Sequence, residues 1–125
     1  MKNRVIIAGS RSCPENDDDL FLKLTLLFRN TDYNDLEIVS GRCKGADKLG
    51  ENYANEMKVP VKQFPADWSL GKKAGYIRNK QMAEYATHLI AIWDGKSKGT
   101  KLMIDLAKEN GLHIRVIKIG YKPII

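Results

Sequence analysis

Three turns of this sequence combine glycine with hydroxyl, basic and acidic residues, which are the residue types that hold phosphate groups. They lie at residues 9–12, 40–47 and 94–100, each after a short apolar run and before a stretch with helical spacing. In a parallel α/β sheet such turns emerge together beyond the carboxyl ends of the strands, where backbone N–H groups and helix N-termini favour anions. The three turns therefore predict a pocket for a phosphorylated small molecule.

The elements that must position these turns follow from the spacing of apolar residues. Apolar runs predict five strands, at residues 4–8, 36–39, 59–64, 88–92 and 114–119. Apolar residues at i, i+3 and i+4 predict four helices, at residues 17–29, 46–57, 76–86 and 100–110. This alternation predicts a single α/β domain over residues 1–125: Rossmann-like, doubly wound, with a five-stranded, mainly parallel sheet and helices on both faces.

One connection in this scheme is long and irregular, at residues 65–75. Long loops within compact α/β domains often carry function, so this segment is expected to face the ligand. A different interpretation applies to the three consecutive acids at residues 17–19. Acids at the start of a helix are expected to cap it and to favour its dipole, so we interpret them as structural and not as metal ligands.

Composition and charge narrow the function classes. The chain has 125 residues, of which 43% are hydrophobic and 29% charged, the composition of an ordinary globular protein. The first apolar run is too short for a signal peptide, and no run approaches the roughly 18 residues of a membrane helix, so a cytoplasmic protein without a membrane partner is expected. The net charge of +6 could signal nucleic acid, but it is spread along the chain and not gathered into a basic run, and a positive pocket for an anionic ligand explains it as well.

The cysteines argue against a zinc site, and one of the turns argues against a nucleoside triphosphatase. Cys13 and Cys43 lack zinc-site spacing and are expected to be free thiols, with a disulfide or a metal pair between their loops as the alternative. The turn at residues 95–100 contains glycine, lysine, serine and threonine but lacks the Gly-Lys-Ser/Thr ending of a P-loop in the required frame. A nucleoside triphosphatase is therefore not expected, and neither a metal nor a cofactor is predicted.

Five ordered motifs resemble the YspA/YpsA-related branch of the SLOG (SMF/DprA–LOG) superfamily of Rossmann-like proteins. The motifs are Gly9-Ser10-Arg11, residues 40–47, Ala66-Asp67-Trp68, residues 74–82 and residues 93–100. The superfamily includes cytokinin-activating phosphoribohydrolases, sensor domains for signals of the ADP-ribose type and the single-strand DNA loader DprA. The resemblance implies a pocket for a nucleotide or a nucleotide derivative.

The resemblance also implies roles for single residues. Arg78 would pair with a phosphate through two hydrogen bonds, which Lys does not reproduce, beside Gly99 and Thr100. Trp68, or less favourably Trp93, would stack on a base. His88 and His113 are interpreted as structural. The expected ligand-binding residues are Gly9, Ser10, Arg11, Gly41, Gly45, Asp47, Trp68, Arg78, Asn79, Asp94, Gly95, Ser97, Gly99 and Thr100.

A departure from the phosphoribohydrolase pattern bears on turnover. In those relatives an Arg of an R-K-x-x-M motif and a Glu of a G-G-x-G-T-x-x-E motif act in hydrolysis. Arg78 and Met82 match the first motif, whereas Met103 occupies the position of the Glu. General acid–base catalysis contributes about 10²–10⁴-fold in rate, so its loss favours binding without turnover.

The expected function is therefore binding of a ligand of the ADP-ribose or cyclic-nucleotide type. Binding of this kind would suit a sensor, or a viral protein that sequesters an immune signal in the host cytoplasm. The protein is also expected to form a homo-oligomer, either a dimer or an assembly of dimers. Two alternatives stay open. One is a phosphoribohydrolase in which Arg78 acts with Asp105 or Glu84. The other is a DprA-like binder of single-stranded DNA, favoured by the positive charge.

Overall fold

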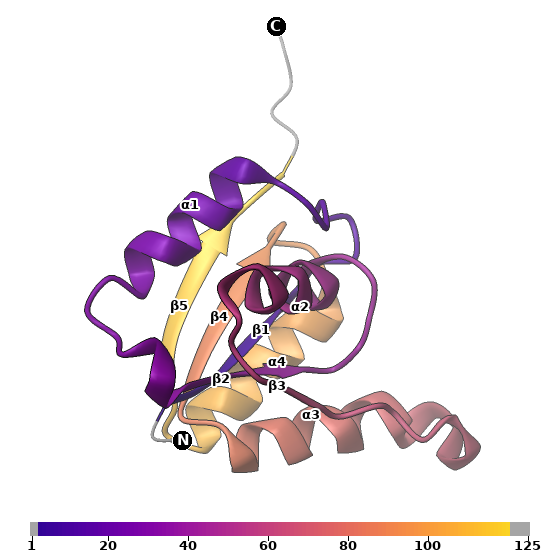
Figure 1. Ribbon diagram of the computed structural model, residues 1–125. Coiled ribbons are helices and arrows are strands. Elements are labelled where there is room, and N and C mark those ends of the chain that lie inside the picture. Colours follow the sequence, from indigo (N-terminus) through magenta and orange to yellow (C-terminus); the bar gives the residue numbers. More distant parts are fainter. Residues whose placement is uncertain (1–2, 121–125) are drawn as a thin grey trace, which may run out of the picture.

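The computed structural model describes residues 3–120, and its strands form one five-stranded sheet (Figure 1). The strands are β1 (Asn3–Gly9), β2 (Leu36–Ser40), β3 (Val61–Gln63), β4 (His88–Trp93) and β5 (His113–Lys118). Their order is β3-β2-β1-β4-β5, and every neighbouring pair is parallel. The predicted Rossmann-like sheet is confirmed. The order reverses between β1 and β4, which makes these two strands the topological switch point.

The helices cover both faces of the sheet, as expected for a doubly wound fold. They are α1 (Asp18–Leu27), α2 (Ala46–Met57), α3 (Ala74–Tyr85) and α4 (Lys98–Glu109), with a short 3₁₀ helix, η1 (Tyr33–Asp35), before β2. Figure 1 shows α1 and α2 on one face and α3 and α4 on the other. Each face of the sheet has its own hydrophobic core. Ile7 of β1 packs into the core beneath α1 and α2, and Ile6 packs into the core beneath α3 and α4, because successive side chains of a strand point to opposite faces.

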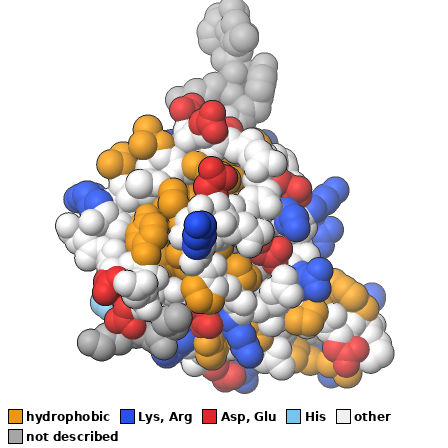
Figure 2. Space-filling model, in the orientation of Figure 1, with side chains coloured by type: hydrophobic (Ala, Val, Ile, Leu, Met, Phe, Trp, Pro, Cys, Tyr) orange, Lys and Arg blue, Asp and Glu red, His pale blue; other side chains and the backbone are white. Residues whose placement is uncertain are grey.

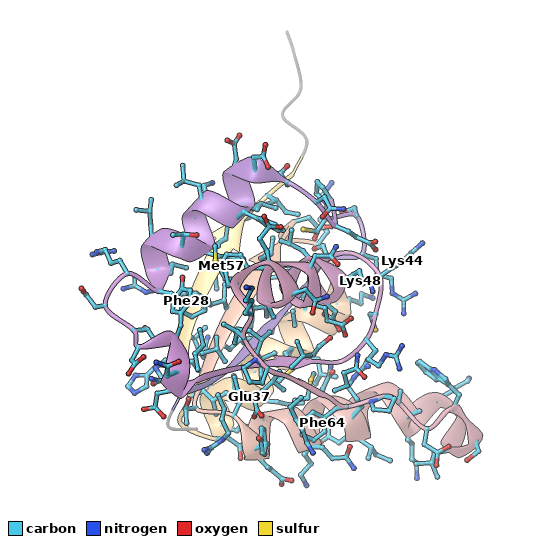
Figure 3. All side chains as sticks on the ribbon, in the orientation of Figure 1. Phe28, Glu37, Lys44, Lys48, Met57 and Phe64 are labelled. Carbon is cyan, nitrogen blue, oxygen red and sulfur yellow. The ribbon has the colours of Figure 1, made fainter. Side chains whose placement is uncertain are left out.

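An aromatic cluster closes the core under α1. Figure 3 shows Phe28 directed inward from the end of α1. Its ring stacks on Tyr53 of α2 with the centroids 6.0 Å apart, and Phe21 meets Tyr53 edge-on at 5.5 Å. The Tyr53 hydroxyl is satisfied by Thr25 and Tyr33, at 3.1 and 3.0 Å. This face of the sheet is therefore well packed beneath the middle of α1.

Side-chain caps set the starts of two helices. Asp17 Oδ1 accepts a hydrogen bond from the Leu20 N–H at 2.9 Å, which confirms the capping role expected for this acidic segment. Ser97 Oγ accepts one from the Thr100 N–H at 3.3 Å, so α4 begins at Lys98, two residues earlier than the apolar spacing predicts. The Ser97 cap therefore fixes the N-terminus of α4 relative to the turn that precedes this helix.

The segment expected to be an irregular connection is mostly helical. Residues Trp68–Lys73 form a 3₁₀ helix, η2, because Asp67 Oδ1 accepts from the Ser69 N–H at 3.1 Å, and α3 then begins at Ala74. Together, η2 and the first turn of α3 project beyond the sheet in Figure 1, and we call residues 68–76 the η2–α3 arm. Trp68 on this arm is 64% exposed.

The surface of the described residues is mixed in charge. Figure 2 shows Lys and Arg side chains interspersed with Asp and Glu over the face drawn, and hydrophobic side chains over the projecting arm at the lower right. In the part of the chain that the structure describes, no helix is long and apolar enough to cross a membrane.

Candidate functional site

A cavity of about 460 Å³ lies at the carboxyl ends of β1 and β4, and we call it the switch-point cavity. Ligands of open α/β sheets bind at this place, where the strand order reverses. Its walls come from all three predicted turns and from α3 and α4. The lining residues are Ala8, Gly9, Arg11, Ser12, Cys43, Asp47, Arg78, Asn79, Met82, Asp94, Ser97, Gly99, Thr100 and Met103.

The N-terminus of α4 supplies backbone donors to this cavity. Ser97 accepts the N–H groups of Thr100, through its hydroxyl, and of Lys101, through its carbonyl at 3.2 Å. The first N–H groups of a helix have no intrahelical partner, so those of Lys98 and Gly99 remain available for a ligand. Gly99 also lines the cavity. The positive end of the helix dipole adds to this attraction for an anion.

Arg78 enters the cavity from α3 with its guanidinium held in place. It is 8% exposed, and it donates to the Gly41 carbonyl, to Asn79 Oδ1 at 2.9 Å and to Cys43 Sγ at 3.5 Å. A guanidinium has five N–H donors, and these three contacts leave two of them for a ligand. Because the group is already fixed, little side-chain entropy would be lost when it pairs with a phosphate.

Asp47 is a buried carboxyl in the same cavity. It is 5% exposed, and its Oδ2 accepts from the Cys43 N–H at 3.2 Å. Burial raises the pKa of Asp47 from 3.8 to about 6, although the Cys43 N–H and the positive charge of Arg78 both oppose this rise. Glu51, one turn further along α2, raises the pKa as well. Asp47 is therefore the carboxyl of the cavity that titrates nearest to neutral pH.

This raised pKa predicts a pH dependence of stability. Folding favours protonated Asp47, so the stabilisation is complete below about pH 4 and is lost as the pH rises through about 6. The shift corresponds to about 3 kcal/mol. Urea unfolding from pH 4 to pH 8 should therefore show the free energy of unfolding of the native protein falling relative to that of Asp47→Asn, which cannot titrate. A constant difference across this range would contradict the assignment.

The turn between β2 and α2 is not the open phosphate cradle that its glycines predict. The Gly45 N–H donates to the Glu15 carboxylate at 2.9 Å, and the Ala46 N–H donates to the Ser10 carbonyl at 3.2 Å. Gly45 itself does not line the cavity. Because these N–H groups are used within the protein, the turn contributes side chains such as Asp47 to the site instead of a backbone cradle.

Ser10 has a structural position instead of the expected place at the ligand. It is 1% exposed and does not line the cavity. Its Oγ accepts from the Asp94 N–H at 3.0 Å, and its carbonyl accepts from the N–H groups of Cys13 and Ala46. Ser10 therefore joins the three turns around the cavity to one another.

Removing the Ser10 hydroxyl should destabilise the protein. Ser10→Ala removes the hydrogen bond to the part-buried Asp94 N–H, and a typical hydrogen bond of this kind contributes about 0.5–1.5 kcal/mol to stability. Ser12→Ala, in the same turn but exposed, is the matched control and should change the free energy of unfolding by less than about 0.5 kcal/mol. The two variants are compared by urea unfolding, and equal losses would show that the Ser10 hydroxyl has no special role.

The structure brings together most of the expected ligand-binding residues. Those that line the cavity are Gly9, Arg11, Asp47, Arg78, Asn79, Asp94, Ser97, Gly99 and Thr100. Ser10, Gly41, Gly45, Trp68 and Gly95 do not line it.

The structure gives a physical reason why each of the other expected residues does not line the cavity. Trp68 lies on the η2–α3 arm and is exposed. Gly41 presents its carbonyl to Arg78, and Gly95 faces the Lys118 side chain. The alternative base platform, Trp93, donates its indole N–H to the Ser97 carbonyl at 3.1 Å and braces the turn before α4.

Five lining residues were not expected to bind a ligand. They are Ala8, Ser12, Cys43, Met82 and Met103. Ser12 and Cys43 lie within predicted turns, and Met82 lies one turn after Arg78 on α3, so their proximity in sequence to expected residues was the available signal. Both cysteines are free, with Cys13 buried and Cys43 partly exposed.

The acids expected to serve an enzyme do not reach the cavity. Asp105 forms an exposed ion pair with Lys101 at 2.9 Å, because α4 turns it toward solvent, and Glu84 is exposed on α3. Asp94 does line the cavity, but its Oδ1 accepts from the N–H groups of Lys96 and Ser97, which lower the pKa of Asp94. The assignment of Asp105 or Glu84 as a catalytic acid is therefore not supported by their positions.

Comparison with known proteins agrees with this architecture. A family model described as "YspA, cpYpsA-related SLOG family" matches residues 3–71, from β1 into η2, which is more than half of the chain. The matched range includes the first two turns of the cavity and ends before Arg78 and the turn that precedes α4. Neither the curated proteins nor the solved structures gave a significant match. With the family model covering the sheet strands β1 to β3 and the two turns between them, the chain belongs to the YspA, cpYpsA-related SLOG family.

Proposed function

We propose that this protein binds a phosphate-bearing nucleotide derivative in the switch-point cavity and releases it unchanged. The observation that carries the proposal is the meeting of two kinds of anion-binding group at one cavity. The α4 N-terminus presents backbone N–H groups there, and Arg78 presents guanidinium N–H groups, with Arg11 also in the lining. SLOG family membership supports a nucleotide-related ligand for this pocket.

The side chain at the position of the phosphoribohydrolase Glu supports binding over turnover. Met103 lines the cavity and is 2% exposed, so an apolar thioether lies where the resemblance places a carboxylate. A thioether neither donates nor accepts a proton at neutral pH. Asp94 is already engaged by two backbone N–H groups, which hold it in its ionised form. The cavity therefore suits recognition of a phosphate more than cleavage of a glycosidic bond.

The finer part of the proposal is a ligand of the ADP-ribose or cyclic-nucleotide type, bound by a sensor or by a protein that sequesters the ligand. Sequestration of a scarce signal requires roughly nanomolar affinity, about −12 kcal/mol. Fixed charged contacts at Arg78 and the α4 N-terminus, together with the apolar walls of Met82 and Met103, are the features that support such affinity.

The test is to combine the purified protein with AMP, ADP-ribose, cyclic ADP-ribose isomers and cyclic dinucleotides. Calorimetry measures binding, and chromatography after denaturation measures whether the ligand is intact. Stoichiometric binding with full recovery of one of these ligands is the expected result. A panel in which none of the compounds binds would refute the proposal, and a single-stranded oligonucleotide with strongly salt-dependent affinity would support the DNA-binding alternative.

Hydrolysis of a nucleoside monophosphate is the second candidate, and Asp47 is the observation that favours it. A buried carboxyl with a pKa of about 6 has the properties of a general acid. If the protein is a phosphoribohydrolase, it should release free base from AMP, and Asp47→Asn should abolish release while AMP still binds. If it is a binding protein, no base is released by either form.

A further inference from the structure

A second cavity lies at the opposite edge of the sheet from the switch-point cavity. Its volume is about 600 Å³, and we call it the amino-edge cavity because it opens between the end of α1 and the amino ends of β1, β4 and β5. Cavities of this size hold small organic molecules. The residues that line it are Asn3, Val5, Leu27, Phe28, Arg29, Asn30, Thr31, His88, Leu89, Ile90, His113, Ile114 and Arg115.

The charged and titratable groups of the amino-edge cavity are all basic. Arg29 comes from the end of α1, His88 from β4, and His113 and Arg115 from β5, whereas no Asp or Glu occurs among the described residues that line it. Arg29 Nη1 donates to the Leu26 carbonyl at 2.7 Å, which fixes that guanidinium at the end of the helix. The Arg115 guanidinium has no hydrogen bond or ion pair to any residue within 3–120.

The two imidazoles lie side by side. His88 and His113 are register partners on the parallel strands β4 and β5, and their ring centroids are 5.0 Å apart. His88 Nδ1 lies 2.7 Å from the Thr87 hydroxyl, which orients its ring. Burial and the proximity of His113 lower the pKa of His88, so this ring is uncharged at neutral pH and the two Arg side chains carry the positive charge.

A metal ion is the other ligand that paired histidines suggest, and the lining argues against it. Within the described residues no group of three or more His, Cys, Asp and Glu side chains is placed to hold a metal ion. A cation would also approach Arg29 and Arg115 without a carboxylate to offset their charge. An anion, by contrast, gains from both guanidinium groups and from either imidazole once it is protonated.

The floor of the cavity indicates what the rest of the ligand is like. Val5, Phe28 and Ile90 are buried and apolar, whereas His113 and Arg115 are exposed. A charged head group therefore finds its partners among the exposed side chains of the lining, and an apolar body gains by covering the hydrophobic floor.

We propose that the amino-edge cavity is a second binding site, for a small organic anion with one phosphate or carboxylate head and an apolar body. The site is distinct from the switch-point cavity in every lining residue. Arg115 is the main anchor for the head, because its guanidinium is unengaged by the described protein groups. The apolar floor selects for ligands larger than the bare ion.

The test uses the imidazole NMR signals of the full chain. The chain contains two histidines, and both line this cavity, so their signals report on it alone. Phenyl phosphate and phenylacetate are titrated separately, and the tighter ligand identifies the preferred head. Saturable shifts of both histidines are expected, and the titration midpoint of His88 should rise in the complex because an anion stabilises the imidazolium. Failure of both probes to give saturable shifts would overturn the proposal.

Variants assign the binding to this cavity. Arg115→Gln should weaken the preferred probe about tenfold or more, by loss of a charged hydrogen bond. Lys118→Gln removes the same charge from the other end of β5, where the Lys118 side chain lies beside Gly95, and should leave the affinity unchanged. Equal weakening in both variants would mean a diffuse effect of charge and overturn the site.

Two further measurements, with inorganic phosphate and with an Arg78 variant, complete the test. Inorganic phosphate should bind more weakly than phenyl phosphate, since it does not use the apolar floor, and equal affinity would contradict the role of that floor. Arg78→Lys should leave the histidine shifts intact, because Arg78 lies in the other cavity. The two sites therefore fail or succeed independently.

Discussion

Arg78→Lys should lower the affinity for the nucleotide ligand about 100-fold, the equivalent of roughly 2–3 kcal/mol. Lysine keeps the positive charge beside Asp47 but cannot hold the Gly41 carbonyl and Asn79 while it donates two parallel hydrogen bonds to a phosphate. Calorimetry with the ligand found in the panel above measures the change. An unchanged affinity would remove Arg78 from the phosphate site.

Two controls separate this loss from a general effect of charge or of stability. Lys44→Gln removes a positive charge from the turn before α2, and Figure 3 shows the Lys44 side chain directed away from the core into solvent. This variant should bind as the native protein does. Arg11→Ala changes an exposed residue of the cavity lining and should weaken binding by about tenfold without lowering the melting temperature, since no described core contact depends on Arg11.

Gly45→Ala should destabilise the protein by about 3 kcal/mol or more, or prevent it from folding. Gly45 has a φ of 85°, and a Cβ on it would lie 2.4 Å from the Ser10 carbonyl oxygen and 2.6 Å from the Arg11 Cα. Both are backbone atoms of the turn after β1, which is tied in place by Ser10, so they cannot move aside without breaking the site. Thermal unfolding should show a melting temperature lower by about 10 °C or more.

Gly75→Ala is the matched control for this prediction. A Cβ on Gly75 meets no atom within 4 Å, and the residue lies in α3 with ordinary helical geometry. Alanine is favoured over glycine in a helix by about 0.5–1 kcal/mol, so this variant should be slightly more stable than the native protein. If Gly45→Ala were as well tolerated as Gly75→Ala, the close contact between the first two turns would not be required for folding.

Local patterns in the sequence were sufficient for the architecture. The apolar runs and helical spacings predict β1 to β5 and α1 to α4 in the right order, because strand and helix periodicity depends on neighbouring residues. Capping is also local: Asp17 and Ser97 act on N–H groups three residues away. The turn before α4 and, from its resemblance to a family motif, Arg78 could therefore be predicted as site residues, and both line the switch-point cavity.

Which atoms of the turns remain free was decided only by tertiary structure. Ser10 and Gly45 have the residue types of a phosphate cradle, yet their polar groups are consumed by Asp94 and Glu15, which are far away in the sequence. The direction in which a side chain points also decides whether it reaches the cavity. Trp68 projects outward on the η2–α3 arm, and Asp105 forms an ion pair with Lys101 at the surface. Such outcomes depend on how distant segments pack, which no local periodicity encodes.

The contact between His88 and His113 was also decided only by the tertiary structure. Nothing in their separation along the chain predicts contact, and it arises because β4 and β5 lie in parallel register at the edge of the sheet. The sequence thus contains the order of the elements and the chemistry of the turns, since both are local properties. The sheet order and the packing of the helices on it determine which of those groups meet at a cavity and which are spent on holding the fold together.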